Sequence, residues 1–305
     1  MQYLGSKKKL IPFIQSTIYG IVGTDLSDKI FCDLFTGTAT VGRFFKNCTK
    51  QVIANDLEFY SFILNRNYIG NHEEIQGSGS GRMYFSDHNG KKIDTLRQGI
   101  ENLRTIENID NDLYYFLLAS LLEGADRAAN VTAAYTTYLK HFSSTTQKPL
   151  ILEPANFEIT ENSHQVFNEN ANTLIQRITG DVLYIDAPSS GWQYGANYHL
   201  LNTIALYDNF VPKGKTGKRA YNKSAWCRRR QVEHELDDLL KNAQFKYIFL
   251  SYNNEGLMSH QIIKGIMSKY GHYDAVSTEY KRFKSDSSIH KANRTTESIH
   301  VLEMQ

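Results

Sequence analysis

Residues 30–56 constrain the fold more than any other part of the chain. An apolar run of strand length, 30–35, enters a turn that contains Gly37, and an amphipathic stretch over 41–47 is typical of a helix. A second short strand is expected at 51–55. Strand, helix and strand together form a βαβ unit. Such a unit predicts a parallel sheet with right-handed crossovers, whose ligands bind beyond the carboxyl ends of the strands.

The rest of the chain continues this alternation around a mainly helical segment. The fold class is therefore α/β, with an open, mostly parallel sheet, helices on both of its faces and a helical insertion. We expect one domain from residues 1–76 and 164–305, with residues 77–163 inserted into it. The patterns predict helices at 7–21, 57–70, 93–103 and 113–124, and strands at 182–185, 247–250 and 298–302.

Composition is that of an ordinary globular chain. Of its 305 residues, 41% are hydrophobic and 22% are charged, and no apolar stretch reaches the length of a membrane span. A cytoplasmic location is expected, with no membrane partner. Cys32, Cys48 and Cys227 have no paired spacing, so we expect neither a disulfide framework nor a zinc site, and no other metal.

Positive charge is concentrated in one stretch, although the net charge is only +2. Residues 213–230 contain no Asp or Glu, and Tyr221 and Trp226 lie among the basic side chains. The pattern is typical of contacts to nucleic-acid phosphates, but a solvated basic loop explains it equally well. The basic residues of this stretch are Lys213, Lys215, Lys218, Arg219, Lys223, Arg228, Arg229 and Arg230.

Two adjacent strand ends carry residues suited to a nucleotide. Gly37 in the first turn lets the backbone approach a ligand closely, and the following helix presents free N–H groups. Asp56 follows the second strand, where an acidic residue can accept hydrogen bonds from a ribose diol. Together they favour a ligand that contains adenosine. A purely structural turn, and Asp56 as a helix N-cap, are the alternatives.

A third strand end carries a carboxylate. Asp186-Ala187-Pro188-Ser189 follows the apolar strand at 182–185, and Trp192 and Tyr194 come shortly after it. Here the chain resembles the Dam-like class of adenine-specific DNA methyltransferases, whose motif at this place is Asp-Pro-Pro-Tyr. Residues 3–7, 33–37, 55–56 and 251–255 resemble further motifs of that class, in the same order.

The resemblance implies a Rossmann-like methyltransferase fold that uses S-adenosylmethionine to methylate the exocyclic amine of adenine in double-stranded DNA. The resemblance further points to a restriction–modification role, with a cognate restriction endonuclease or a second methyltransferase subunit as a partner, and an orphan methyltransferase is the alternative. Residues 77–163 would belong to the DNA-recognition region. The implied cofactor-binding residues are Tyr3, Lys7, Asp33, Phe35, Gly37, Thr38, Asp56, Asn170 and Asp186. The candidate DNA-binding residues are Lys213, Lys215, Lys218, Arg219, Arg228 and Arg229 from the basic stretch, and Lys281 and Arg282 from a mixed basic and aromatic segment that a surface-exposed strand end explains about as well.

Catalysis would use the loop around Asp186. Its carboxylate and the Ala187 carbonyl would accept hydrogen bonds from the amine of an adenine flipped out of the duplex. Ser189 stands where the class has an aromatic residue that stacks on the base, so either Trp192 or Tyr194 takes that place or the flipped base is held poorly.

Four positions depart from the pattern of the class. Besides Ser189, Ala187 replaces a proline, Ala39 replaces a second glycine, and Asn170 replaces an aspartate that would accept a hydrogen bond from the cofactor adenine. Because of these departures, a non-catalytic DNA-binding homologue or specificity subunit stays open as an alternative. A small-molecule or protein methyltransferase is a third possibility, against which the basic stretch and the helical insertion argue.

Overall fold

A seven-stranded sheet organises one of the two units into which the chain divides. The computed structural model describes residues 7–69, 83–132, 134–144, 146–157, 160, 162–208, 210–281 and 294–305. The strands lie in the order β3-β2-β1-β4-β5-β7-β6. They are β1 (Ile30–Asp33), β2 (Gln51–Asn55), β3 (Gln165–Phe167), β4 (Thr179–Ile185), β5 (Gln244–Asn253), β6 (Gly271–Lys281) and β7 (Arg294–Met304).

Parallel pairing at the centre of the sheet positions the candidate site. Strand β1 pairs in parallel with both β2 and β4, so that Asp33 lies opposite Ala54 on one side and Tyr184 on the other. Strand β7 is antiparallel to β5 and β6. The carboxyl ends of β1, β2 and β4 therefore meet at one edge of the sheet.

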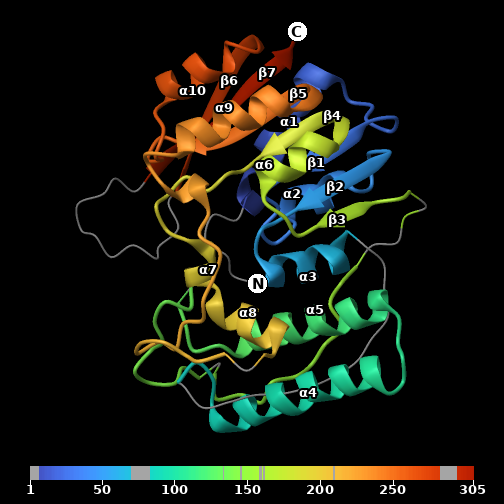
Figure 1. Cartoon of the computed structure of the whole chain (residues 1–305), viewed down its shortest axis with the longest axis vertical. Helices are drawn as coiled ribbons and strands as arrows, with labels where there is room; N and C mark the ends of the chain where they lie inside the picture. The colour runs from blue at the N-terminus through green and yellow to red at the C-terminus, as the bar shows by residue number, and fades with distance from the viewer. Residues whose placement is uncertain are drawn as a thin grey trace. The chain divides into compact units, whose positions relative to one another are not determined.

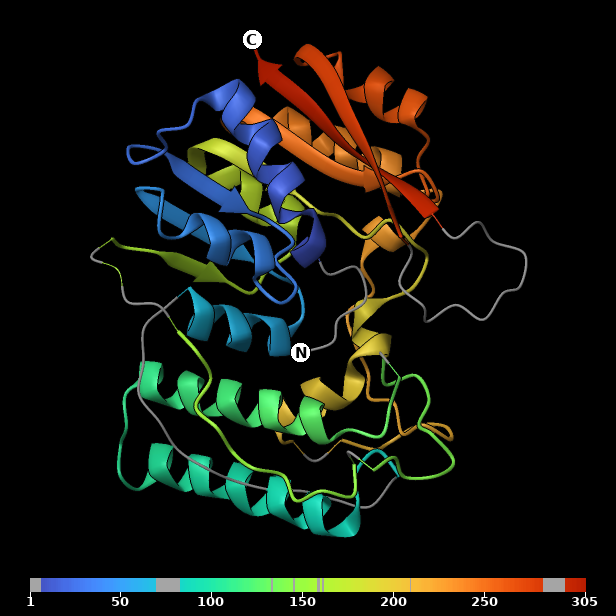
Figure 2. The same ribbon diagram turned by 180° about the vertical axis from the view of Figure 1, so that it is seen from behind.

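Helices cover both faces of this sheet. Figure 1 shows α6 (Ala171–Leu174), α9 (Val232–Asn242) and α10 (His260–Met267) over one face. Figure 2 shows α1 (Ile11–Val22) and α2 (Thr40–Phe45) over the other. Successive side chains of a strand point to opposite faces of the sheet, so the apolar residues of the central strands bury one helical layer on each face. The expected α/β fold class is confirmed.

Each layer is held by buried apolar side chains. In β1, Phe31 packs with α1 and α2, whereas Cys32 belongs to the cluster that includes α9. In α9, Leu236 and Leu240 are one turn apart and completely buried. Burial of one such side chain contributes about 1.5–3 kcal/mol. Cys32 and Cys227 are buried, and all three cysteines are free.

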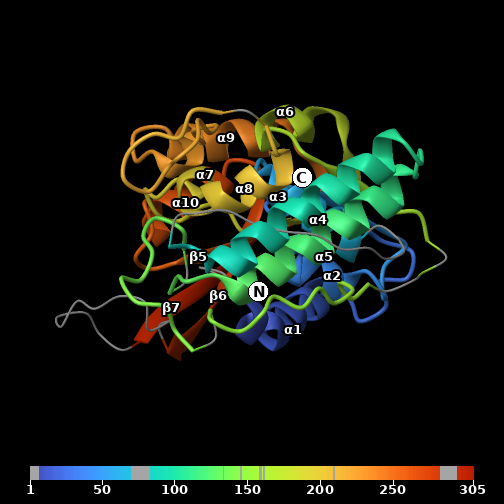
Figure 3. The same ribbon diagram turned by 90° about the horizontal axis from the view of Figure 1, so that it is seen from below.

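The second unit is mainly helical. It contains α3 (Phe59–Tyr68), α4 (Asp87–Thr105), α5 (Asn111–Ala128), α7 (Tyr194–Asn197) and α8 (His199–Leu206). Figure 3 shows α4 and α5 side by side, as Figure 2 also does. The N-caps of these two helices are Ser86 and Asp110, whose side chains accept hydrogen bonds from the backbone N–H groups of Asn89 and Leu113.

The limits of this helical unit differ from those of the expected insertion. Its described residues fall within 58–159 and 194–222, not only within 77–163. The reason is packing between segments distant in sequence, because α3 and α8 both contact α5 and each other. The sheet unit comprises residues 6–57, 160–193 and 223–305, and residue 6 lies outside the described part.

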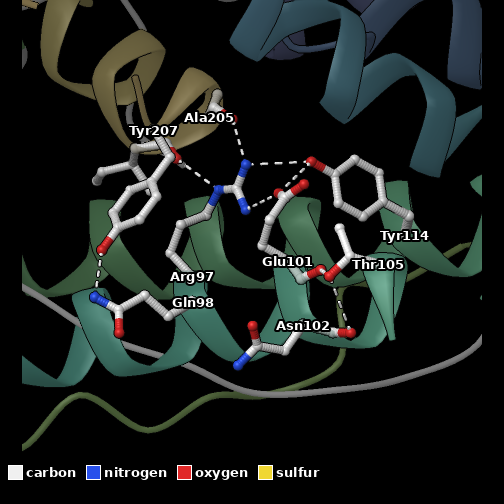
Figure 4. Close-up of polar contacts among 9 residues, drawn as sticks. Arg97, Gln98, Glu101, Asn102, Thr105, Tyr114, Ala205 and Tyr207 are labelled. Atoms are coloured by element: carbon white, nitrogen blue, oxygen red, sulfur yellow. Dashed lines mark hydrogen bonds and ion pairs between the residues drawn. The ribbon is translucent and has the colours of Figure 1, made fainter. Parts of the chain in front are cut away.

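A buried arginine holds three helices of the helical unit together. Arg97 of α4 is only 2% exposed. It donates to the carbonyls of Ile204 and Ala205 at the end of α8, at 3.1 and 3.2 Å. It also donates to Glu101 at 2.6 Å and to the Tyr114 hydroxyl of α5 at 3.2 Å (Figure 4). These bonds satisfy carbonyls that the end of α8 leaves without helical partners.

Two strands were not expected from the sequence, β3 and β6. Strand β3 has only three residues, too few for a periodic pattern. Strand β6 lies at the edge of the sheet and alternates between exposed and half-buried residues, so it has no apolar run. The helix expected at 7–21 begins as a 3-10 turn, Lys7–Leu10. No helix among the described residues is long and apolar enough to cross a membrane.

We expect the substitution Arg97→Met to destabilise the helical unit by about 2–4 kcal/mol, because it leaves buried carbonyls and the Tyr114 hydroxyl without their donor. Tryptophan fluorescence would not report on the helical unit, because Trp192 and Trp226 both lie in the sheet unit. The free energy of opening is therefore measured by hydrogen exchange of the amides in α4 and α5. Arg127→Met is the control, because the Arg127 side chain is 42% exposed and its ion pairs are superficial. That control should lose less than about 1 kcal/mol. Equal losses in the two variants would contradict the role given to Arg97.

Candidate active site

Three carboxylates follow adjacent strands at one edge of the sheet. Asp33 ends β1, Asp56 follows β2 and Asp186 follows β4. Asp33 is 1% exposed, and its Oδ2 accepts a hydrogen bond from the Gly42 N–H at 2.8 Å. Within the described part of the chain, its Oδ1 is buried without a hydrogen-bond partner.

The electrostatics of Asp33 follow from this position. Burial raises its pKa to about 8, the charges of Asp186 and Asp56 add to the rise, and the hydrogen bond from Gly42 opposes it. At neutral pH this pKa leaves most of the Asp33 carboxyl groups protonated, and a cation bound beside the unpaired oxygen would stabilise the ionised form. This edge of the sheet therefore suits a positively charged ligand.

A lysine from the start of the described chain links Asp186 to a second acid. The Lys7 Nζ lies 3.0 Å from Asp186 Oδ1 and 3.0 Å from Glu297 Oε1. Burial lowers the pKa of Lys7, but the two carboxylates hold it well above its ordinary value. Burial raises the pKa of Asp186 to about 6; Lys7 opposes this rise and Glu297 adds to it. The sequence assigned Lys7 to the cofactor, and in the structure its ammonium group contacts the Asp186 carboxylate.

The glycine turn is fixed from both sides. Gly37 has a φ of 52°, and its N–H donates to Asp56 Oδ2 at 2.8 Å. The N-cap alternative for Asp56 is wrong, because α3 begins at Phe59 and its N-cap position is Glu58. Thr38 and Thr40 share a hydroxyl contact at 3.3 Å.

Ala39 has a left-handed backbone, with φ 61° and ψ 18°. This is the conformation in which a glycine would be unstrained, and an alanine costs about 1 kcal/mol more there. Phe35, also in this turn, is half-buried and packs edge-on against Trp226 with ring centroids 5.2 Å apart. Trp226, which the sequence placed among the basic residues, is thus a buried core residue.

Asn170 caps a helix. Its Oδ1 accepts hydrogen bonds from the N–H groups of Asn172 and Thr173, at 2.9 and 3.2 Å, at the start of α6. The carboxamide oxygen expected to accept a bond from the cofactor is therefore already engaged. The exposed side chain presents its NH₂ group, which is a donor. An aspartate at this place could cap the helix and still offer an acceptor.

The loop after Asp186 is anchored at both ends. The Ser189 hydroxyl accepts a hydrogen bond from Asn253 Nδ2 at 3.0 Å, and the Ser189 carbonyl accepts one from the Leu257 N–H at 2.9 Å. The Gln193 carboxamide bonds twice to the backbone of Ser224, at 3.0 and 2.8 Å. Ala187 is buried and Pro188 half-buried. The loop is thus held by hydrogen bonds instead of by a second proline.

The two aromatic candidates of this region differ. Trp192 is 70% exposed, and its backbone carbonyl lies 3.3 Å from the thiol of Cys227. Tyr194 belongs to the helical unit, where its ring stacks on that of Tyr198 at 6.1 Å and an interplanar angle of 19°. Trp192 therefore has the more accessible ring face.

The basic residues occupy three kinds of position. Lys213 and Lys218 pair as an antiparallel bridge around a turn that carries Lys215; Lys213 and Lys215 are exposed and Lys218 is half-buried. Arg228 and Arg229 are exposed just before α9.

Arg219 is different, because it is 9% exposed and makes a bidentate ion pair with Asp208 at 2.9 and 2.7 Å. Its guanidinium therefore has a partner inside the protein. Tyr3 and Arg282 lie outside the described residues, as does the side chain of Lys281.

Glu297 was not expected from the sequence as part of the site. It lies in β7, and its residue is 1% exposed. The only signal is an acidic residue beside the apolar run of the final strand, at 298–302, and that signal does not identify Lys7 as its partner. Ser251 donates to Glu297 Oε1 at 2.7 Å, within the segment 251–255 that resembled a family motif.

Sequence comparison identifies the family. The model of the D12 class N6 adenine-specific DNA methyltransferases matches residues 3–266. The chain belongs to this family. It is accordingly an adenine-specific DNA methyltransferase, and membership implies S-adenosylmethionine as methyl donor and DNA as substrate.

Curated relatives of this methyltransferase support the assignment. Type II methyltransferase M.NlaIII of Neisseria lactamica is 51% identical over 331 aligned residues, covering 99% of each chain. Type II methyltransferase M.CviAII of Paramecium bursaria Chlorella virus 1 is 33% identical, over 94% of this chain and 93% of the relative. Type II methyltransferase M.FokI of Planomicrobium okeanokoites is 34% identical over 93% of this chain, which spans 50% of that protein.

The loop of this methyltransferase offers a test of its anchoring. We expect Ser189→Ala and Asn253→Ala to be coupled by about 0.5–1.5 kcal/mol, because both remove the same hydrogen bond. Asn253→Ala should have the larger single effect, since Asn253 Oδ1 also accepts a bond from the Glu255 N–H at 3.0 Å. Denaturant unfolding followed by tryptophan fluorescence measures both variants and their combination. Strictly additive losses would show that the two side chains do not interact.

Proposed function

We propose that this methyltransferase methylates adenine N6 at defined sites in double-stranded DNA, with Asp186 as the group that activates the amine. The observation that carries the proposal is the state of the Asp186 carboxylate. Lys7 bonds its Oδ1, no described residue bonds its Oδ2, and the side chain is 23% exposed. One carboxylate oxygen is thus available to a substrate while the other fixes the orientation of the group.

The chemistry requires this arrangement. The exocyclic amine of adenine is a poor nucleophile, because its lone pair is delocalised into the ring. A hydrogen bond to Asp186 Oδ2, and a second to the Ala187 carbonyl, would draw the amine towards a pyramidal geometry. Bound S-adenosylmethionine supplies an electrophilic methyl group. Asp186 must be ionised to accept from the amine, so its pKa of about 6 keeps it active at neutral pH.

Residues at the three strand ends fit such a donor. Asp33 Oδ1, buried and unpaired within the described chain, suits a cationic group, and Asp56 holds the turn that contains Gly37. We assign cofactor binding to this turn, including Phe35 and Thr38, and to Asp33 and Asp56. Asn170 would contribute through its NH₂ group. Lys7 and Asp186 act on the amine side, and the role of Tyr3 rests on the sequence alone.

Trp192 is our choice for the aromatic that stacks on the flipped base. Its exposure supports this, whereas the ring of Tyr194 is already stacked on Tyr198. Stacking of one base contributes about 1–3 kcal/mol, which offsets part of the cost of unstacking it from the duplex.

Contacts to the DNA backbone are assigned to basic residues that are exposed or half-buried. One short hairpin of the helical unit carries Lys213, Lys215 and Lys218. The Tyr84 hydroxyl donates a hydrogen bond to the Thr216 carbonyl of this hairpin at 3.3 Å. Arg228 and Arg229 are exposed on the sheet unit. Lys281 and Arg282 remain candidates from the sequence. We exclude Arg219 from this set because of its ion pair with Asp208.

A restriction–modification role follows from the relatives. M.NlaIII, M.CviAII and M.FokI are named as type II methyltransferases. We infer that this enzyme protects DNA from a cognate endonuclease, and that the helical unit contributes to recognition of the site.

The central prediction concerns Asp186. We expect Asp186→Ala to lower kcat for DNA methylation by at least about 100-fold. Binding of S-adenosylmethionine, followed by calorimetry, should remain measurable. Asp274→Asn, an exposed carboxylate change on β6, serves as the control and should keep wild-type activity. The wild-type kcat/KM should fall as the pH drops below about 6, because the protonated carboxyl group no longer accepts from the amine. A fully active Asp186→Ala enzyme would disprove the assignment.

A second prediction separates the two aromatic residues. Trp192→Ala should lower kcat/KM for DNA by about 5- to 150-fold, the equivalent of one lost stacking contact, while Trp192→Phe keeps most of the activity. Incorporation of labelled methyl groups into unmethylated plasmid DNA measures the effect. A loss in Tyr194→Ala but not in Trp192→Ala would transfer the role to Tyr194.

A further inference from the structure

Glu297 is buried in the sheet unit with a charge that the proposed chemistry does not use. Its residue is 1% exposed, its Oε1 takes bonds from Lys7 at 3.0 Å and from Ser251 at 2.7 Å, and its Oε2 has no hydrogen-bond partner in the described part of the chain. Burial of a carboxylate is costly, and an apolar residue in β7 would serve the sheet better. The position therefore calls for a reason beyond packing.

The contacts of Lys7 indicate what that reason is. Its ammonium group lies at the same distance, 3.0 Å, from both carboxylates, and its side chain is 10% exposed. With Asp186 as its only partner, Lys7 would neutralise the carboxylate that faces the amine. With Glu297 present, the three groups carry a net charge of −1, counted as one ammonium and two carboxylates.

A net negative charge matters for the transfer that we propose for this site. As the methyl group reaches N6, positive charge develops on the amine, and a negative field there stabilises that state more than the neutral amine. Lys7 alone would cancel much of this field. We propose that Glu297 is a positioning residue of the methyl-transfer site: by binding Lys7, it lets the lysine orient Asp186 without neutralising it. This inference rests on the proposed function of Asp186.

The surroundings of Asp186 are consistent with a dominant effect of this pair. The charged and titratable groups that face it are Lys7 from the 3-10 turn, Glu297 from β7, Asp33 from β1 and Tyr184 from β4. Lys7 is the only cation among these groups. Because Glu297 raises the pKa of Asp186, loss of its charge should lower that pKa.

Glu297→Gln is the test, because it removes the charge and keeps the size and an acceptor oxygen for Lys7 and Ser251. We expect two effects together. The plateau kcat should fall by at least about tenfold, because Asp186 is neutralised by Lys7. The acid limb of the kcat/KM profile should move to lower pH, because Asp186 becomes easier to ionise.

Three further variants make the result decisive. Glu297→Asp keeps the charge and should recover most of kcat. Ser251→Ala removes one hydrogen bond but no charge, and should leave the acid limb unmoved. Glu303→Gln, an exposed change on the same strand, should behave as wild type. Thermal unfolding and calorimetry with S-adenosylmethionine show in each case that the fold and the cofactor site are intact.

The outcomes separate this inference from the proposed function. An inactive wild-type enzyme would overturn the proposed function itself. An active wild type, together with a Glu297→Gln enzyme of unchanged kcat and acid limb, would overturn only the role of Glu297. Reduced activity with an unmoved acid limb would likewise overturn it, because that result is what a purely structural residue would give.

Discussion

The placement of three carboxylates, one buried and two half-buried, at neighbouring strand ends is the constraint on which the rest of the sheet unit depends. Parallel pairing of β1 with β2 and β4 fixes Asp33 between Asp56 and Asp186. Like charges in a medium of low dielectric repel strongly unless hydrogen bonds or cations compensate them. The compensating groups are the Gly37 N–H on Asp56, the Gly42 N–H on Asp33 and the Lys7 ammonium on Asp186. The glycine turn and the 3-10 turn therefore both reduce the repulsion among the three carboxylates.

The loop after Asp186 lacks the second proline and the aromatic residue of the class motif. Proline and an aromatic residue would stiffen the loop and stack on the base within four consecutive residues. Here stiffness comes from Ser189 with Asn253 and from Gln193 with Ser224, and the exposed ring is that of Trp192. On our proposal, functions that the class concentrates in one motif are distributed over a longer segment of this chain. The family assignment and this distribution together leave the non-catalytic alternative without support.

Sequence patterns predicted those parts of the structure that depend on local order. The βαβ unit, the strand-end carboxylates and the α/β class follow from periodicity and turn residues, and the order of motifs pointed to the family. Contacts between distant segments could not be predicted. The partnership of Lys7 with Glu297 joins residues 290 positions apart, the inclusion of α3 and α8 in the helical unit depends on packing against α5, and the capping by Asn170 depends on where α6 begins.

The ion pairs of Lys7 with two carboxylates also limit which substitutions the sequence can accept at these positions. A neutral residue at position 7 would leave buried Glu297 and half-buried Asp186 without their shared cation, and a neutral residue at position 297 would leave Lys7 to neutralise Asp186. We therefore expect single exchanges at either place to be selected against and paired exchanges to be tolerated. Among descendants of this gene, positions 7 and 297 should vary in concert, although one stands near the start of the polypeptide and the other near its finish.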